Sequence, residues 1–90
     1  MNQELLGLKS KVRYRAVGEE GVLVHLENGN VIVVNEVGLH IVQTLASPST
    51  REHLAISISQ DFDVSVEQAA TDLEIYLAEL DAEQVLEHHA

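Results

Sequence analysis

The feature that most constrains this chain is a run of four aliphatic residues, Val31-Ile32-Val33-Val34, in a protein of only 90 residues. A strand without a polar side chain on either face is normally buried on both sides. A domain of this size has room for one core of two layers and rarely has enough protein to cover a strand twice. The sequence therefore raises the question of what covers the second side of this strand.

Patterns on both sides of the run predict a small antiparallel sheet. Residues 12–17 alternate between apolar and charged side chains, which is typical of a half-exposed strand. Residues 22–27 form a second strand pattern, and Asn28-Gly29 tolerates the positive φ of a tight hairpin turn into residues 31–34. Three strands therefore come first in the chain.

The length of the hairpin loop decides which residues are paired. A two-residue turn would place Leu26 opposite Val31, whereas a three-residue loop with a bulge would place Val24 opposite Ile32. We favour the second register. It points the even-numbered residues of the run toward the core and the odd-numbered residues outward.

Three helices are predicted after the strands. Asn35 can cap the first helix, which ends before Ser47-Pro48. Residues 49–52 are typical of a capping box that opens the second helix. Ser65 can cap the third helix, which is predicted from about residue 66 to at least residue 82. The predicted inward stripe of this helix is Val66, Ala69 or Ala70, Leu73, Leu77 and Leu80.

This order of elements predicts an α+β fold with one domain, in which helices pack on one face of a three-stranded antiparallel sheet. We expect the domain to span residues 12–86. Residues 1–11 lack strong periodicity and are expected to form a flexible N-terminal arm, and residues 87–90 a short C-terminal tail. The tail contains His88-His89, which are either native or a remnant of an expression tag.

The charge of the chain narrows the class of partner. Fifteen acidic residues against five basic ones give a formal charge of −10. Nucleic-acid binding draws its affinity from Lys and Arg, so this balance argues against it and favours a basic or neutral peptide. Four of the five cations lie between Lys9 and Arg15. The acidic residues of the third predicted helix are interpreted as a solvated face or as a surface that steers a basic partner.

No group of residues predicts catalysis or a metal site. The chain has no cysteine, and His25, His40 and His53 fall on different predicted elements. No nucleophile with a base in reach and no pair of catalytic carboxylates is evident. No segment approaches the roughly 18 apolar residues of a membrane span, and no signal peptide is evident. We therefore expect a cytoplasmic protein that is not an enzyme, holds no metal and needs no cofactor.

The order of elements and several segments resemble the PqqD-like proteins. Residues 22–42 are similar to the hairpin of that family, which ends in an aliphatic strand, an Asn and a helix of small residues. Asp63-Val64 and residues 70–80 are similar to its break and final helix. The resemblance covers about residues 12–86. It implies a winged helix-turn-helix-like domain that recognises the leader of a ribosomally made precursor peptide and presents it to modifying enzymes.

In PqqD-like proteins the leader adds as a strand to the third strand, in the groove between that strand and the third helix. The short acidic form of this chain resembles members of lasso-peptide pathways, which work with a separate leader peptidase and a cyclase. The peptide-binding residues that the resemblance implies are Val31, Ile32, Val33, Val34, Ala69, Asp72, Leu73, Tyr76 and Leu80.

Several alternatives stay open. One is a PqqD-type chaperone for a radical SAM enzyme of PQQ biosynthesis. Another is a winged-helix regulatory or DNA-binding domain, although the third predicted helix has no Lys or Arg for phosphates. A homodimer paired through its exposed strand edges would bury the same valines. Tyr76 either lines the groove or is a tyrosine at the edge of the core with its hydroxyl in water.

Overall fold

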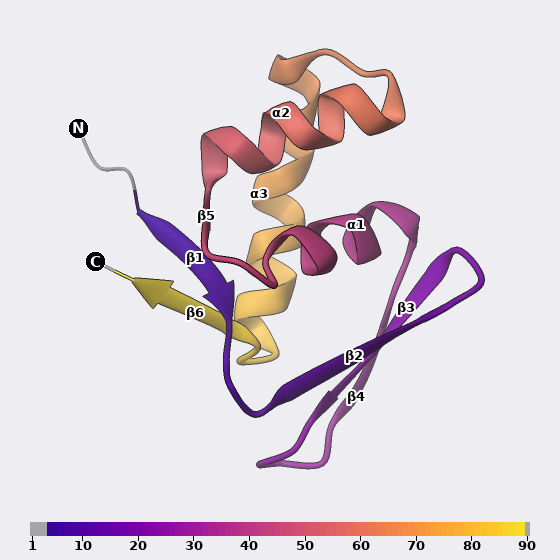
Figure 1. Cartoon of the computed structure of the whole chain (residues 1–90), viewed down its shortest axis with the longest axis vertical. Coiled ribbons are helices and arrows are strands. Elements are labelled where there is room, and N and C mark those ends of the chain that lie inside the picture. Colours follow the sequence, from indigo (N-terminus) through magenta and orange to yellow (C-terminus); the bar gives the residue numbers. More distant parts are fainter. Residues whose placement is uncertain (1–3, 90) are drawn as a thin grey trace.

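The chain folds into three helices and two small antiparallel sheets (Figure 1), and the computed structural model describes residues 4–89. The predicted α+β class is confirmed, with the hairpin strands before the helices. The elements in chain order are β1 (Leu5–Leu8), β2 (Val12–Val17), β3 (Glu20–His25), β4 (Val31–Val34), α1 (Glu36–Thr44), β5 (Ser49–Thr50), α2 (Arg51–Phe62), α3 (Val66–Ala82) and β6 (Leu86–His89).

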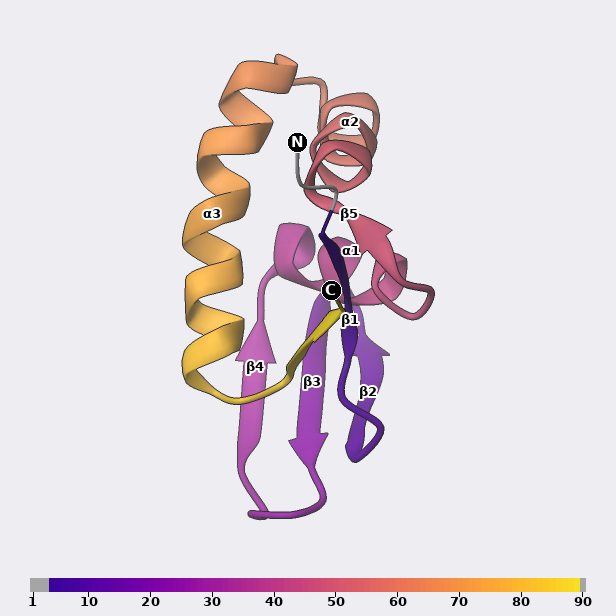
Figure 2. The ribbon, with the colours of Figure 1, turned by 90° about the vertical axis from the view of Figure 1, so that its left-hand side faces the viewer.

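The larger sheet has the strand order β2-β3-β4, which makes β4 an edge strand. Its inner face carries Leu23 and His25, both buried, and packs on α1. Close packing here depends on glycine, because a Cβ added at Gly38 would lie 2.8 Å from the Cβ of Val34. Figure 2 shows α3 running alongside the β4 edge. The fold therefore places one face of a helix beside an open strand edge.

The predicted register of the β3–β4 hairpin is wrong. Val24 lies opposite Val31 and Leu23 lies opposite Ile32, so the strands are shifted by one residue from the register that we favoured. The connection between His25 and Asn30 is longer than expected and is closed by two backbone hydrogen bonds, from His25 N to Asn30 O at 2.9 Å and from Gly29 N to His25 O at 2.8 Å. Ile32 therefore shares the inner face with Leu23 rather than with Val24.

The predicted orientation of the aliphatic run is confirmed despite the shifted register. Ile32 and Val34 are half-buried and pack against the core, whereas Val31 and Val33 remain 63% and 62% exposed. The orientation survives because a side chain's face follows the alternation within its own strand. The pairing partner is set separately by the loop.

The helix starts follow the predicted caps, with one change. The side chain of Asn35 accepts a hydrogen bond from Gly38 N, and that of Ser65 accepts one from Gln68 N. The cap of α2 is Thr50, whose Oγ1 accepts from His53 N at 3.1 Å. In α3 the buried stripe is Ala69, Leu73, Leu77 and Leu80, so the prediction was wrong for Val66, which is exposed.

The second sheet was not predicted from the sequence. It has the order β5-β1-β6, and β1 pairs antiparallel with both of its neighbours. The expectation of a flexible arm was therefore wrong for residues 5–8, where Leu6 is fully buried. Residues 86–89 likewise form a strand, where a tail was expected from residue 87 on. The parts of both expectations that concern residues 1–3 and 90 lie outside the described residues.

Candidate functional site

The open edge of β4 is the first component of the site. On this side β4 has no strand partner among residues 4–89. Antiparallel pairs alternate between hydrogen-bonded and non-hydrogen-bonded, and the bond from His25 N to Asn30 O fixes which pairs are which. The even-numbered residues of β4 therefore bond to β3. The N–H and C=O groups of Val31 and Val33 point away from β3 toward the open edge.

The first hollow lies between β4 and α3 and has a volume of about 390 Å³. Its walls are mainly aliphatic, and two carboxylates from α3 and the residues just after it lie on its border. The lining residues are Ile32, Val33, Val34, Gly38, Tyr76, Glu79, Leu80, Ala82 and Glu83. A hollow of this composition beside an open strand edge can accept apolar side chains of an added strand.

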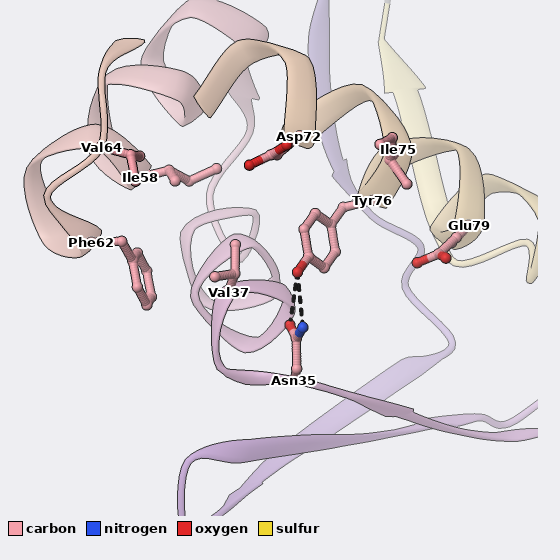
Figure 3. Close-up of a pocket in the computed structure, with 9 residues that line it drawn as sticks. All are labelled: Asn35, Val37, Ile58, Phe62, Val64, Asp72, Ile75, Tyr76 and Glu79. Carbon is pink, nitrogen blue, oxygen red and sulfur yellow. Dashed lines mark hydrogen bonds between the residues drawn. The ribbon is translucent and has the colours of Figure 1, made fainter. Parts of the chain in front are cut away.

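The second hollow lies among α1, α2 and α3 and has a volume of about 470 Å³ (Figure 3). Phe62, Val64 and Ile58 come from the end of α2 and the turn after it, and Val37 comes from α1. The remaining lining residues are Asn35, Asp72, Ile75, Tyr76 and Glu79. This hollow extends the apolar surface from β4 toward the start of α3.

Tyr76 joins the two hollows, since its side chain lines both. Asn35 Nδ2 donates a hydrogen bond to Tyr76 Oη at 2.8 Å, and Oη lies 3.1 Å from Asn35 Oδ1 (Figure 3). Asn35 is also the cap of α1, so its position is fixed. The ring of Tyr76 therefore lines both hollows, and its hydroxyl bonds to Asn35 at the exposed surface. A contact of this ring with a peptide stays a prediction.

We call the β4 edge and the two hollows together the groove, and its charged residues are all acidic. Asp72, Glu79 and Glu83 line it, and no Lys or Arg does so among residues 4–89. Asp72 accepts a hydrogen bond from Gln68 Nε2 at 2.9 Å. Apolar walls with carboxylates along one side favour a ligand that carries both apolar and cationic side chains.

The residues predicted to bind a peptide fall into three groups. The first hollow brings together Ile32, Val33, Val34, Tyr76 and Leu80, and Asp72 lines the second. Val31 lies on the open edge of β4 with an exposed side chain. Ala69 and Leu73 are fully buried in the core and line neither hollow. A direct contact of these last two residues with a peptide stays a prediction. Their burial indicates that they pack α3 against the core.

Sequence reasoning missed several residues of the groove. Glu79 lies three positions after Tyr76 on the same side of α3, and this helical spacing could have identified it. The residues of the second hollow come from separate elements, and no local pattern connects them. The missed lining residues are Asn35, Val37, Gly38, Ile58, Phe62, Val64, Ile75, Glu79, Ala82 and Glu83.

The shifted pKa values of the described residues lie outside the groove. The Arg51 guanidinium, followed by His88, holds the pKa of Glu4 below its usual value. Asp81 and then Glu4 raise the pKa of His88, and the carboxyl of Glu19 raises the pKa of Glu36. Perturbed groups often accompany catalysis, and here they accompany surface contacts between elements.

A Ser-His-Asp arrangement lies between α1 and α2. His40 Nε2 is 2.8 Å from Ser57 Oγ, and His40 Nδ1 is 3.2 Å from Asp61 Oδ2. Nucleophilic catalysis also needs free N–H donors for an oxyanion, but Ser57 lies within α2, where the backbone N–H groups bond to the helix itself. We interpret these contacts as a link between two helices.

Among residues 4–89, no group of three or more His, Asp or Glu side chains lies close enough together to hold a metal ion. His25, considered from sequence as a ligand, is buried, and its Nε2 donates to the carbonyl oxygen of Gln84 at 3.1 Å. In that same part of the chain, each helix is too short or too polar to cross a membrane.

Comparison with known proteins identifies the fold. The family model described as Coenzyme PQQ synthesis protein D (PqqD) matches residues 20–86. No curated protein sequence gives a significant match. The structure of TbiB1 in complex with the TbiA(beta) leader peptide has a TM-score of 0.83 and 25% identity, over 93% of this chain and 98% of that chain.

Two further solved structures share the fold at lower identity. The structure of lasso peptide synthetase B1 complexed with the leader peptide has a TM-score of 0.77 and 17% identity, over 91% of this chain and 96% of that chain. The PqqD truncation of Methylobacterium extorquens PqqCD, described as a stand-alone RiPP recognition element, has a TM-score of 0.76 and 21% identity, over 92% and 88%. These likenesses confirm the resemblance found in the sequence.

Proposed function

Because the chain belongs to the PqqD family, we propose that it binds the leader of a ribosomally synthesised precursor peptide and presents it to modifying enzymes. The leader adds as a strand to β4 and its alternate side chains enter the groove. The observation that carries this proposal is the open edge of β4 beside two apolar hollows. The same fold occurs in TbiB1, whose structure contains a leader peptide.

Strand addition uses the backbone groups that the sheet leaves unpaired. An added strand would bond to the N–H and C=O groups of Val31 and Val33. Burying an apolar side chain contributes about 1.5–3 kcal/mol, and ordering a disordered leader costs about 2–5 kcal/mol. Two or three buried side chains together with the main-chain bonds therefore support a dissociation constant between nanomolar and micromolar.

The lining of the groove indicates which side chains of a leader would fit. Successive inward side chains of a strand are about 7 Å apart, so apolar residues at alternate positions can occupy the hollow beside β4. Glu79 lines both hollows, and Glu83 lies one turn further along the direction of α3. A Lys or Arg beside the apolar residues of the leader would complement these carboxylates.

The proposed partners are a leader peptidase and a cyclase of a lasso-peptide pathway, and no catalytic role is proposed for the chain itself. We expect it to work in the cytoplasm, where ribosomal precursors are made. A second candidate is a PqqD-type chaperone for a radical SAM enzyme of PQQ biosynthesis, which the description of the matching family model favours. Both candidates use the same groove and differ in the precursor and the enzyme.

Two other classes fit the structure less well. A DNA-binding helix needs cations for phosphates, but α3 has none, and the single Arg of α2, Arg51, is engaged with Glu4 and Glu74 at 2.7 and 2.9 Å. A homodimer through β4 would occupy the same edge as the leader. It would make leader affinity fall as protein concentration rises, which sedimentation and titration together would reveal.

The proposal is tested by calorimetric titration with the leader of a short precursor encoded beside the chain. We expect saturable binding at one site per chain with a nanomolar to micromolar dissociation constant. The matched control is a leader of the same composition in scrambled order, which should bind at least about tenfold more weakly because its apolar side chains no longer alternate in register with the hollows. Equal binding of the two peptides would contradict the proposal.

A further inference from the structure

The outer face of the β2-β3-β4 sheet, which points away from α1, is aliphatic and uncovered. Cross-strand partners share a face, so Val24 and Val31 lie together on it, as do Val22 and Val33. Val17 on β2 extends the same face and is 56% exposed. Val22, Val24, Val31 and Val33 form an aliphatic strip in which Val31 and Val33 are exposed and Val22 and Val24 are half-buried. Val17 lies at the end of this strip, opposite Glu20.

Arginines stand beside this strip. Arg13 lies directly opposite Val24 and Arg15 directly opposite Val22, so both guanidinium groups emerge on the outer face. Arg13 Nη1 donates to the carbonyl oxygens of Ser10 and Val12 at 2.7 and 3.2 Å, which leaves its charge uncompensated. The outer face therefore combines an apolar centre with positive charge.

The isolation of these cations is unusual in a chain with a net charge of −10. Four of the five basic residues lie between Lys9 and Arg15, and within residues 4–89 none of the four forms an ion pair. The fifth, Arg51, contacts two carboxylates. Acidic residues are abundant, yet within β2, β3 and β4 the one carboxylate on the outer face is that of Glu20, which lies opposite Val17. Positive charge left uncompensated within one molecule is available for carboxylates of another.

We propose that the outer face docks a folded protein partner that presents aliphatic side chains bordered by carboxylates. Protein interfaces have an apolar centre, and Arg is the charged residue enriched in them. The identification of this partner as an enzyme that processes the bound precursor rests on the proposed function. The outer face and the groove are then separate surfaces for separate partners.

Other occupants fit the outer face less well. A second copy of the chain would bring two basic faces together, which like charges oppose. An anionic membrane would be attracted to Arg13 and Arg15 but repelled by the surrounding excess of carboxylates. A protein can match both the apolar strip and its positive border.

The experiment measures the affinity of each processing enzyme encoded beside the chain for the wild type and for the double variant Arg13→Glu/Arg15→Glu. We expect the double variant to weaken enzyme binding at least about tenfold, mainly through slower association, and the milder Arg13→Gln/Arg15→Gln to weaken it less. The effect should shrink as salt concentration rises. Leader affinity, measured in parallel, should stay within about twofold because neither Arg lines the groove.

The control variant is Gln43→Glu/Gln60→Glu, which adds two carboxylates at exposed positions of α1 and α2 away from the outer face and should leave enzyme binding unchanged. Enzyme affinity that is insensitive to both Arg substitutions would overturn the inference, as would a wild type that binds none of these enzymes. Binding of phosphatidylserine vesicles that is lost in the Arg variants while enzyme binding persists would overturn it in favour of a membrane. Failure of the proposed function is distinguishable, because it would appear as a wild type that does not bind the leader.

Discussion

The groove and the outer face present aliphatic residues in opposite electrostatic settings. In the groove, Tyr76 and aliphatic side chains lie beside Glu79 and Glu83. On the outer face, valines lie beside Arg13 and Arg15. The net charge of −10 does not describe the outer face, because four of the five cations lie between Lys9 and Arg15 and form no ion pair within residues 4–89. Apolar burial can supply affinity on both surfaces, and the sign of the charge selects which partner binds to each.

The aliphatic run contributes to both surfaces because a strand alternates its side chains. Ile32 and Val34 turn toward the core and the first hollow, whereas Val31 and Val33 turn their side chains to the outer face. The backbone of the same two exposed valines supplies the open edge. A run that predicts a strand buried on both sides is thus covered on one side by its own helices and exposed on the other.

The largest effect is expected from Val33→Pro, which should weaken leader binding by about tenfold to a hundredfold. The substitution removes an outward N–H and leaves a carbonyl of the leader unpaired, at a cost of roughly 1–3 kcal/mol. Calorimetric titration measures the affinity, and thermal unfolding checks the fold.

The matched control for this change is Ile32→Pro, one position away. The N–H of Ile32 bonds to β3, so this substitution should destabilise the domain itself. If Val33→Pro unfolded the domain as readily as Ile32→Pro, β4 would behave as an interior strand and the assignment of its open edge would be wrong.

A smaller effect, about tenfold, is expected from Tyr76→Ala on leader affinity. The substitution removes the wall that the two hollows share. Tyr76→Phe keeps the ring and loses only the hydrogen bonds to Asn35, so its cost should be about 1 kcal/mol or less. Titration of both variants with one leader checks the ranking. Equal loss in both would mean that the hydroxyl rather than the ring recognises the peptide.

Glu79→Gln should weaken a leader that carries a Lys or Arg by about twofold to fivefold at low salt. Exposed charge pairs contribute only about 0.2–1 kcal/mol, and salt screens them. The control is Glu52→Gln on α2, an exposed acid that lines neither hollow. Titrations at low and high salt measure the effect. If the loss of leader affinity in Glu79→Gln did not depend on salt concentration, Glu79 would have no electrostatic role in leader binding.

The smallest effect is expected on thermal stability, from the contacts that His88 of β6 makes. Asp81 and Glu4 contact His88 at 3.0 and 2.9 Å and raise its pKa above the usual 6.5. Protonated His88 therefore adds stability that is fully present below about pH 6.5 and is lost as the pH rises through the folded-state pKa. The melting temperature of His88→Gln should fall below that of the wild type more at pH 5.5 than at pH 8.5.

Leader affinity should be the same for the wild type and His88→Gln at each of these two pH values, since His88 lines neither hollow. A deficit in melting temperature that is equal at both pH values would show that the protonated imidazole adds nothing to the stability of β6.

Local patterns predicted the parts of the fold that depend on local physics. The caps Asn35 and Ser65 and the buried stripe of α3 from Ala69 on follow from side chains a few residues apart. The β3–β4 register did not follow, because it depends on how the loop after His25 closes. The pairing of β1 with β6 joins opposite ends of the chain, and neither strand carries a local signal for it.

The groove was predictable in outline and not in composition. The aliphatic run and the family resemblance together indicated β4 and α3, and Tyr76 lies between them as implied. Ala69 and Leu73 were included because the resemblance implies that the third helix forms one wall of the groove, and the resemblance does not separate the side of α3 that faces the core from the side that faces the groove. Phe62 and Val37 were missed because the second hollow forms only when three helices meet.

The most direct test of strand addition to β4 is amide hydrogen exchange in the free and leader-bound protein. Without leader, the N–H groups of Val31 and Val33 should exchange much faster than those of Ile32 and Val34, which bond to β3. Saturation with leader should slow exchange at Val31 and Val33 by at least about tenfold and change Ile32 and Val34 far less. Unchanged exchange at Val31 and Val33 in the saturated complex would contradict strand addition at β4.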